Sequence, residues 1–444
     1  MKSPNDQPSS PPPAMNKESV SAGKVQMKPS PANLKEMLDL GRIFTDENIL
    51  AAAKKQLTKG KARGVDDIDP RAFFKSLRDN KVNRDSLAQA ILSGSHKPKD
   101  YLTVFQPREN KDPRKLSVPA PGDRVVQRII ADAIQDRVSE KFHPQSYAYQ
   151  KGKGPWDGVA KAAQFAKSYP FVVKVDIQSF FDSMNRERLV DLLEPHNLGE
   201  DLCKLVRMYM YAPSREKGHR IWSPIGIAQG GPLSPLLANL YLEDLDSWLE
   251  TRRVPFVRYA DDILLFVKSE KKGLSLLEGI GHFLHGRLKL RVNQKKSKVC
   301  KSKDLPFLGF IVGPSGVGVS AESLRAQLDV LKASVQEWCL TLSVIEATKK
   351  RIGSQLINLA SRYRKTTNYH SVAIPILMDY IEIFENEFLN EKIPNSLKIF
   401  DRESTERAFI RSCFDVLRRR VLGIPFVDVR EDEEWLTDLI NYSG

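Results

Sequence analysis

The sequence predicts an α+β fold in which short apolar strands end in acidic residues and a helical region follows. One observation is the pair Asp261 and Asp262, which stands inside the apolar stretch 254–267, a pattern typical of a hairpin with acids at its tip. Another is the apolar run 171–175, a second predicted strand, which leads directly into Asp176. The third is the spacing of apolar residues at intervals of three and four in the last part of the chain, which predicts a separate all-α region.

The three acids indicate a metal centre. Adjacent carboxylates between buried strands repel each other unless a cation lies between them, and oxygen ligands favour a hard divalent ion such as Mg²⁺, with Mn²⁺ as the alternative. A strand-end Asp176 beside the pair Asp261 and Asp262 would supply ligands for two ions roughly 4 Å apart, an arrangement that supports phosphoryl transfer. The competing interpretation of the Asp pair is a solvated surface turn.

Composition limits the classes of partner. The chain has 444 residues, of which 41% are hydrophobic, so we expect two or three folded units. Its 69 Lys and Arg exceed its 55 Asp and Glu, and the net charge of +14 favours a polyanionic partner, although an anionic membrane surface would also fit. No run of 18 apolar residues and no secretory signal is present, which predicts a cytoplasmic protein without a membrane segment. The four cysteines are too far apart to indicate a disulfide framework or a zinc site.

The chain begins with segments of contrasting composition. Residues 1–33 are rich in Pro, Ser, Asn and Lys and are expected to form a disordered tail. Between about 34 and 95 the apolar spacing is helical, which predicts a helical lead-in. The stretch 101–105 is a predicted strand.

A basic hairpin follows that strand and suits a triphosphate. Arg114 and Lys115 lie on it, and Arg124 opens the helix that comes next. A guanidinium group can bind two phosphate oxygens at once, which is the reason for this interpretation. A solvated basic hairpin is the alternative.

A glycine-rich turn around Gln229 and Gly230 precedes another predicted helix. Glycines let the backbone approach a ligand closely, and Ser234 with Pro235 provides a helix start. Such a helix start favours contacts with a nucleotide or a template, while a plain loop-to-helix joint is the alternative. The basic, aromatic loop 147–154 is a further candidate for holding a template strand.

In their order, these motifs resemble those of a reverse transcriptase of the bacterial group II intron-like kind, which has relatives in retrons and phage-defence systems. The match covers roughly residues 64–318. The segments that carry it are Arg-x-Leu-x-x-Pro at 114–119 with Arg124-x-x-Gln127, the strand with Asp176, Phe180, Phe181 and Asp182, the stretch from Ala228 to Asn239, Tyr259 to Asp262, Asn293 to Lys298, and Phe307-Leu308-Gly309-Phe310.

The resemblance implies a right-hand polymerase with a lead-in and fingers at 34–170, a palm with a ferredoxin-like antiparallel sheet and helices at 171–318, and a helical thumb-like domain at 319–444. It implies an RNA-directed DNA polymerase that extends a primer by two-metal phosphoryl transfer. The implied partners are an RNA template, a DNA or RNA primer and deoxynucleotides. A dedicated non-coding RNA, a partner protein and a homo-oligomer are left open.

The resemblance also implies roles for single residues. Asp176 and Asp261 would be the main metal ligands and Asp262 the third acid, while Lys296 would be a candidate proton donor to the leaving pyrophosphate. The implied nucleotide-binding residues are Arg114, Lys115, Arg124, Phe181, Gln229 and Gly230, and the implied primer grip is Phe307, Leu308 and Gly309. An aromatic ring at Phe181 would crowd a 2′-hydroxyl, which predicts a preference for deoxynucleotides; a core Phe next to Phe180 is the alternative.

Two other functions stay open. One is an RNA-binding or splicing cofactor of the maturase type, and the other is a template-independent or protein-primed DNA nucleotidyl transferase. The region after Ala321 shows neither maturase motifs nor an endonuclease Cys/His cluster, and a retron-type Val-Thr-Gly is missing from 285–300. By elimination, this favours a retroelement-derived system that benefits the host, such as phage defence.

Overall fold

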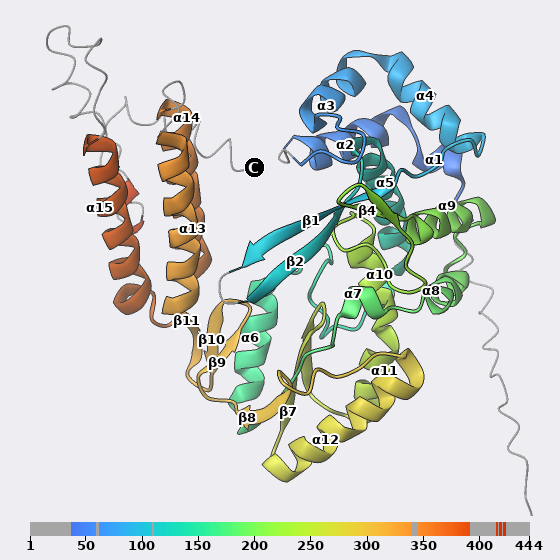
Figure 1. The fold of residues 1–444 in the computed structure, drawn as a ribbon. Coiled ribbons are helices and arrows are strands. Elements are labelled where there is room, and N and C mark those ends of the chain that lie inside the picture. Colours follow the sequence, from blue (N-terminus) through green and yellow to red (C-terminus); the bar gives the residue numbers. More distant parts are fainter. Residues whose placement is uncertain are drawn as a thin grey trace, which may run out of the picture. The chain divides into compact units, whose positions relative to one another are not determined.

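The computed structural model describes residues 37–58, 62–108, 111–339, 345–390, 414–415, 417–419 and 421–422. The predicted tail at 1–33 lies outside the described residues. From Leu38 onward the described residues belong to one compact unit, whose element order is shown in Figure 1. No helix in these described ranges is long and apolar enough to cross a membrane.

Helices form the N-terminal part, as predicted for the lead-in. Within the described residues they are α1 (Leu40–Ile43), α2 (Asp46–Leu57), α3 (Pro70–Asp79) and α4 (Lys81–Leu92). Each begins at a polar side chain that accepts a hydrogen bond from a backbone N–H of the first turn, which is the usual reason for a helix to start there. These caps are Asp39, Thr45, Asp69 and Asn80.

A long antiparallel hairpin follows, and its strands are β1 (Tyr101–Arg108) and β2 (Lys111–Val118). The short strands β4 (Ser214–Glu216) and β5 (His219–Ile221) extend its sheet in the order β2-β1-β4-β5. The long helix α5 (Pro121–Val138) comes directly after β2 and is buried along most of its length. The predicted strand and basic hairpin are therefore confirmed.

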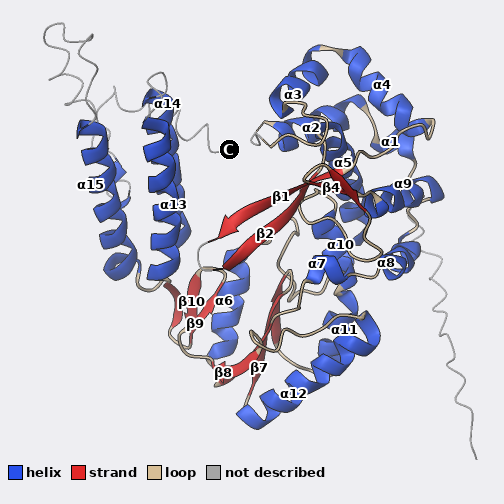
Figure 2. Cartoon of the chain, in the orientation of Figure 1, coloured by secondary structure: helices blue, strands red, loops and turns tan. Residues whose placement is uncertain are grey.

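The central sheet is antiparallel throughout and has the order β6-β7-β3-β8. Its strands are β3 (Phe171–Val175), β6 (Phe256–Tyr259), β7 (Asp262–Val267) and β8 (Lys298–Lys301). Figure 2 shows helices next to this sheet, among them α6 and α12. The helices of this part are α6 (Pro155–Ala166), α7 (Phe180–Ser183), α8 (Arg186–Leu193), α9 (Glu200–Tyr211), α10 (Ser234–Tyr241), α11 (Glu243–Thr251) and α12 (Glu270–Phe283), with the shorter turns η2 (Ser139–Lys141), η3 (Glu194–His196) and η4 (Leu284–Leu288).

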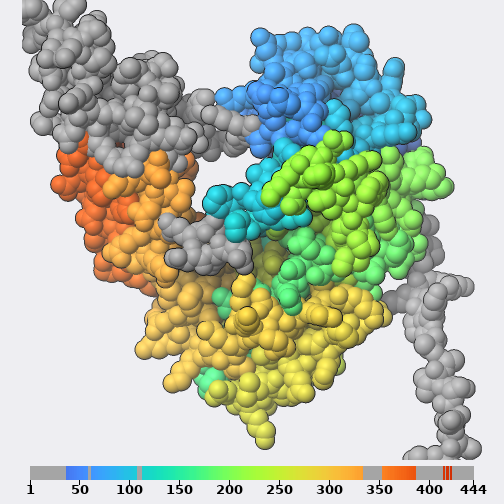
Figure 3. Space-filling model, viewed as in Figure 1, coloured from blue at the N-terminus to red at the C-terminus, as the bar shows by residue number. Residues whose placement is uncertain are grey.

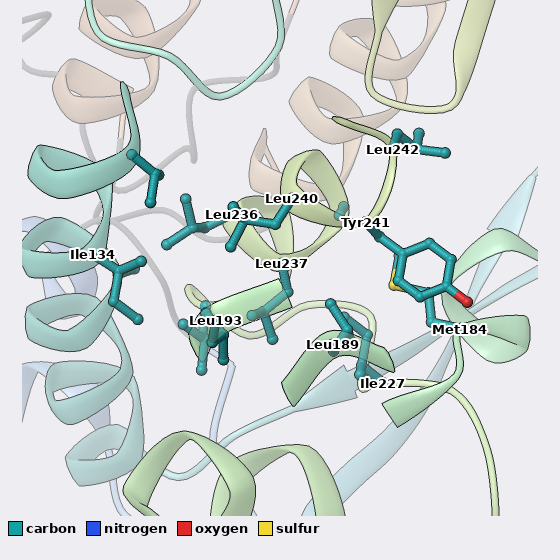
Figure 4. Close-up of a cluster of buried hydrophobic side chains, with 14 of the residues drawn as sticks. Ile134, Met184, Leu189, Leu193, Ile227, Leu236, Leu237, Leu240, Tyr241 and Leu242 are labelled. Atoms are coloured by element: carbon teal, nitrogen blue, oxygen red, sulfur yellow. The ribbon is translucent and has the colours of Figure 1, made fainter. Parts of the chain in front are cut away.

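Two hydrophobic cores lie on opposite faces of this sheet because successive strand residues point to opposite sides. Val173 and Leu265 join the first core, together with side chains of α2, α5, α8 and α10. Figure 4 shows part of it, where Ile134 of α5, Leu193 of α8 and Leu237 of α10 gather. Composition led us to expect two or three separate units, but a sheet that is buried on both faces joins the two cores in one.

The second core joins the central sheet to the C-terminal helices. It contains residues of the other sheet face, of α6 and of the sheet β11-β10-β9. The strands of that small sheet are β9 (Leu305–Phe307), β10 (Phe310–Gly313) and β11 (Gly316–Val319). They lead into α13 (Ala321–Cys339), α14 (Ile345–Tyr363), η5 (Tyr369–Ala373) and α15 (Ile374–Asn390), which confirms the helical region predicted from Ala321.

Two local predictions were wrong. We expected Phe180 and Phe181 on a strand, but β3 ends at Val175, the backbone of Ser179 turns left-handed with φ of 45°, and both rings lie on α7. We also expected one strand over 307–312. Instead, Leu308 and Gly309 have φ of 51° and 82°, so the chain reverses between β9 and β10.

Candidate active site

The hairpin β6–β7 carries two acids at its tip. Tyr259 and Asp262 form the last pair of the ladder, so Ala260 and Asp261 make a two-residue turn. The first turn residue, Ala260, has φ of 56°, as the tight hairpin turns that match strand twist require. This turn holds Asp261 and Asp262 at the edge of the central sheet.

The register of β3 brings a third acid to the same edge. Val175 is paired with Ile263, and one further step along the two antiparallel strands sets Asp176 opposite Asp262. The backbone of Asp176 is fixed from the other side, since its N–H donates to Ser297 Oγ at 2.9 Å and its carbonyl accepts from the N–H of Asn293 at 2.8 Å. The strand ladder and the loop before β8 thus position this carboxylate jointly.

The electrostatics of the cluster agree with this geometry. Desolvation raises the pKa of the Asp261 carboxyl, and the charge of Asp176 raises it further. Asp262 is exposed as a residue, yet the dense surroundings of its carboxyl group raise its pKa, with Asp261 and Asp176 adding to the effect. The Nζ of Lys296 lies 3.8 Å from Asp176 Oδ2, and its positive charge lowers the pKa of both Asp261 and Asp262.

The donor set fits a hard divalent cation. The three groups are carboxylates, the oxygen ligands that Mg²⁺ and Mn²⁺ prefer, and their mutual repulsion is the charge pattern that a cation relieves. Within the described ranges, however, no three His, Cys, Asp or Glu side chains are already grouped as a complete ligand set. The metal ligands therefore stay a prediction.

Arg114 of β2 faces this cluster. Its charge lowers the pKa of Asp261, against the effects that raise it. With its side-chain amide oriented so that the oxygen faces Arg114, Gln229 accepts from Arg114 Nη2 at 2.7 Å and donates to the carbonyl of Lys115 at 3.2 Å. The glycine-rich turn therefore supports the basic hairpin directly.

Gly230 allows the glycine-rich turn to approach β2 closely. The Ser117 N–H donates to the Gln229 backbone carbonyl at 2.7 Å, and a Cβ on Gly230 would lie 2.8 Å from the Ser117 carbonyl oxygen. Gly230 also has φ of 129°, a conformation that side chains rarely adopt. The glycine that we predicted to contact a nucleotide is thus one that lets the turn approach β2.

Two of the predicted phosphate ligands are placed elsewhere. Lys115 lies on the opposite face of β2 from Arg114, and its Nζ is 3.3 Å from Glu216 Oε2. Arg124 is buried in α5, where it donates to the carbonyls of Pro119, at 2.9 Å, and Ala62. The structure therefore brings Arg114 to the acids, but neither of the other two.

The two aromatic residues of α7 differ in burial, as the predicted gate requires. Phe180 is buried against Tyr241, whereas Phe181 is half-buried at the edge of the first core. The Phe181 carbonyl accepts from the N–H of Ile227 at 2.8 Å, so α7 is tied to the segment that leads into the glycine-rich turn.

The predicted primer grip is the turn between β9 and β10. Arg362 Nη2 of α14 donates to the Leu308 carbonyl at 2.9 Å, and the Tyr363 hydroxyl donates to the Gly309 carbonyl at 3.2 Å. A groove of about 300 Å³ lies beside this turn, lined by Asp262, Leu308 and residues at the start of α13. The C-terminal helices therefore hold the turn beside a groove that Asp262 also lines.

The family model described as "Reverse transcriptase (RNA-dependent DNA polymerase)" matches residues 97–312, the range that contains every acid of this cluster. Residues 97–312 of the chain match a reverse transcriptase domain. The resemblance of the motifs is thereby confirmed, and with it the right-hand polymerase fold of mixed α+β type. Reverse transcriptases use divalent metal ions, in agreement with the carboxylate donors described above.

Similar proteins include a retron reverse transcriptase and a group II intron-encoded protein. Protein YkfC of Escherichia coli K12 is 26% identical over 60% of this chain and 81% of its own length, and the Retron Ec86 reverse transcriptase of Escherichia coli is 23% identical over 64% and 88%. The group II intron-encoded protein LtrA of Lactococcus lactis is 22% identical over 56% of this chain, which spans only 53% of LtrA. A structure of telomerase from Candida albicans in complex with a fragment of telomeric RNA aligns with a TM-score of 0.41 and 14% identity, over 83% of this chain and 71% of that one.

Sequence reasoning missed the groups that hold the reverse transcriptase acids in place. Ser297 fixes Asp176, and the fully buried Arg258 lies two residues before Ala260 and pairs with Asp246. The only sequence signal for Arg258 is a charged residue inside an apolar strand. Tyr149, on the loop that we considered for template contacts, lies near Asp261, whose charge together with desolvation raises the pKa of the Tyr149 hydroxyl.

Proposed function

We propose that this reverse transcriptase extends the 3′ end of a primer on an RNA template, with Asp176, Asp261 and Asp262 as the acids of the reaction centre. The observation that carries the proposal is their convergence at one edge of the central sheet, with Arg114 facing them. Carboxylates on one side and a guanidinium on the other match a reaction in which a triphosphate meets an attacking hydroxyl.

The side chains have separate tasks in this reaction. Arg114, held by Gln229, binds phosphate oxygens of the incoming nucleotide. Lys296, next to Asp176, is placed to give a proton to the leaving pyrophosphate. When bound by the three carboxylates, Mg²⁺, or Mn²⁺ in its place, would supply positive charge for the attacking and leaving oxygens.

Phe181 is proposed to select deoxynucleotides. Its ring is half-buried at the end of α7, while the neighbouring Phe180 packs in the core, so Phe181 is the ring that a substrate can meet. A 2′-hydroxyl would collide with this ring. The protein is therefore expected to incorporate deoxynucleotides in preference to ribonucleotides.

The wider role follows less directly from the site. Relatives include a retron reverse transcriptase and a group II intron-encoded protein, so a retroelement-derived or anti-phage system with its own non-coding RNA is the setting that we propose. The primer, a partner protein, a homo-oligomer, a cytoplasmic location and the boundaries of fingers, palm and thumb stay predictions.

A primer-extension assay tests the proposal. Purified protein is given a primed RNA template, Mg²⁺ and labelled deoxynucleotides or ribonucleotides, with and without template. We expect template-dependent DNA from the wild type and a loss of at least about a thousandfold in the Asp261→Ala/Asp262→Ala variant. RNA binding should change little, because phosphate contacts by Lys and Arg dominate affinity.

The matched control is Glu200→Ala/Asp201→Ala, which removes two adjacent acids from the exposed first turn of α9. It should retain full synthesis. DNA made equally well without template would support the template-independent transferase instead. RNA binding without synthesis by the wild type would support the maturase-type cofactor.

A further inference from the structure

Arg258 is one of the largest fully buried side chains of the described residues and lies two residues before Ala260, where the turn begins. Its side chain is 0% exposed, and that of its partner Asp246, on α11, is 2% exposed. Arg258 Nε donates to Asp246 Oδ1 at 2.7 Å, and Nη2 donates to Asp246 Oδ2. The guanidinium therefore makes a two-point contact with the carboxylate, a geometry that fixes its plane.

The remaining nitrogen of the guanidinium reaches two other elements. Arg258 Nη1 donates to Asn239 Oδ1 of α10 at 3.0 Å and to the carbonyl of Ala260 at 3.4 Å. Ala260 is the left-handed residue of the turn, and Asp261 follows it directly. One side chain thus connects two helices with the backbone that aims a catalytic acid.

The backbone of Arg258 binds a further segment. Its N–H donates to the Gln145 carbonyl, and its carbonyl accepts from the Tyr147 N–H, both at 2.9 Å. Asn239 Nδ2 donates to the Ala148 carbonyl at 2.8 Å, so the amide that holds Arg258 also holds this segment.

This segment runs parallel to β6, since Ser146 is bridged to Arg258. Tyr149 follows three residues later and lies near Asp261, since desolvation and then the charge of Asp261 raise the pKa of its hydroxyl. Tyr149 has φ of 57° and is 45% exposed, so an unusual backbone conformation presents a ring next to the acids. The network around Arg258 therefore holds both the turn at Ala260 and the segment that leads to Tyr149.

Stability alone does not account for a buried pair of this kind. Removing two charges from water costs about as much as their attraction returns, and apolar residues of similar volume are often equally or more stabilising. What apolar residues cannot supply is the directed contact with the Ala260 carbonyl and with Asn239. Geometry is therefore the contribution that is specific to the ion pair.

We propose that Arg258 is a positioning residue, which, through Asp246 and Asn239, sets the turn at Ala260 and thereby the direction of the Asp261 carboxylate. This inference rests on the proposed polymerase function, since it concerns how the acids of that reaction are aimed. Arg258 is shielded from solvent and acts through Asp261. Small errors in the placement of a reacting group reduce the rate strongly without weakening substrate binding to the same degree.

The test replaces the pair with apolar residues, in the variant Asp246→Leu/Arg258→Met, assayed by primer extension on RNA. We expect a melting temperature close to that of the wild type, a KM for deoxynucleotides within about twofold, and a kcat lowered about a hundredfold. A purely structural role predicts instead that kcat is retained when stability is retained, and that result would overturn the proposal.

The control is Asp46→Leu/Arg84→Met, which makes the same chemical change at the ion pair between α2 and α4. It should keep the wild-type kcat, and a similar loss of kcat there would also overturn the proposal. Should the first variant not fold, Arg258→Lys keeps the charge next to Asp246 but cannot reach Asn239 and Ala260 together. A wild-type kcat in Arg258→Lys would refute positioning, whereas absence of synthesis by the wild type would refute the polymerase function itself.

Discussion

Two antiparallel hairpins face the same site, and they are built in opposite ways. The strands of β6–β7 are almost wholly buried, with β3 paired to one edge and the segment 145–147 bonded to Arg258 at the other. In β1–β2, strand β2 is at the end of its sheet in the described chain, and Phe105 is 47% exposed. Figure 3 shows this cyan hairpin on the surface of the molecule.

The difference separates two tasks of the reverse transcriptase. Buried contacts fix the acids of β6–β7, so substitutions there are expected to change kcat. Arg114 on β1–β2 is exposed and reaches the rest of the site through Gln229, so substitutions there are expected to change nucleotide binding. The hairpin β1–β2 contacts the glycine-rich turn, where Ser117 meets Gln229 and Gly230, and α10, which follows that turn, contacts Arg258 of β6 through Asn239.

The largest effect is expected for Asp176→Asn on the buried side of this comparison. Synthesis should fall by at least about a thousandfold, because a carboxylate that we propose to bind metal is lost. In metal-free buffer the variant should nevertheless be more stable toward unfolding. The reason is that Asp176 raises the pKa of both Asp261 and Asp262 by repulsion.

Primer extension with Mg²⁺ measures synthesis, and thermal unfolding in EDTA measures stability. Both use the same protein preparation. Asp201→Asn, an exposed substitution on α9, is the control and should change neither. A destabilised Asp176→Asn variant would show that favourable contacts of the Asp176 carboxylate outweigh its repulsion of Asp261 and Asp262, so that the three acids would not form a strained cluster in the absence of metal.

Sequence reasoning identified the residue types of the candidate site, but not the directions in which their side chains point. The acids could be predicted because strand ends and hairpin tips are visible as patterns in the chain. Arg114 and Lys115 are neighbouring basic residues of one sequence motif, and only the strand pairing shows that they lie on opposite faces. Arg124 is equally basic, yet packing of α5 buries it against backbone carbonyls. The Arg258 contact with Asp246 depends on how two elements meet, which no local pattern records.

A smaller effect is expected at the joint between the hairpin β1–β2 and the glycine-rich turn. Gly230→Ala would place a Cβ 2.8 Å from the Ser117 carbonyl oxygen, so the turn that carries Gln229 must shift away from β2. We expect kcat/KM for deoxynucleotides to fall about tenfold to a hundredfold, because Arg114 loses its support. Steady-state primer extension on RNA measures this.

Gly218→Ala is the control for Gly230→Ala. It separates the effect of the steric contact with Ser117 from the effect of backbone strain. Gly218 also has a positive φ, of 85°, but a Cβ there would meet no atom within 4 Å. Both variants should lose about 1–3 kcal/mol of stability from strain, while only Gly230→Ala should lose activity. Equal losses of activity would mean that the contact between the glycine-rich turn and β2 does not support Arg114.

The smallest effect compares neighbouring residues of β2. Arg114→Ala should raise the KM for deoxynucleotides about tenfold with little change in kcat, since one charge-assisted contact with a phosphate is lost. Lys115→Ala should change KM by less than about twofold, because Lys115 faces Glu216 and an exposed ion pair contributes little. Each variant removes one positive charge from adjacent positions, so a general effect of charge on RNA binding would alter both alike. An increase in the KM for deoxynucleotides in both variants, with RNA binding unchanged, would show that Lys115 turns toward the nucleotide when the substrate is bound. The exposed hairpin, unlike the buried one, would then change its side-chain arrangement during the reaction.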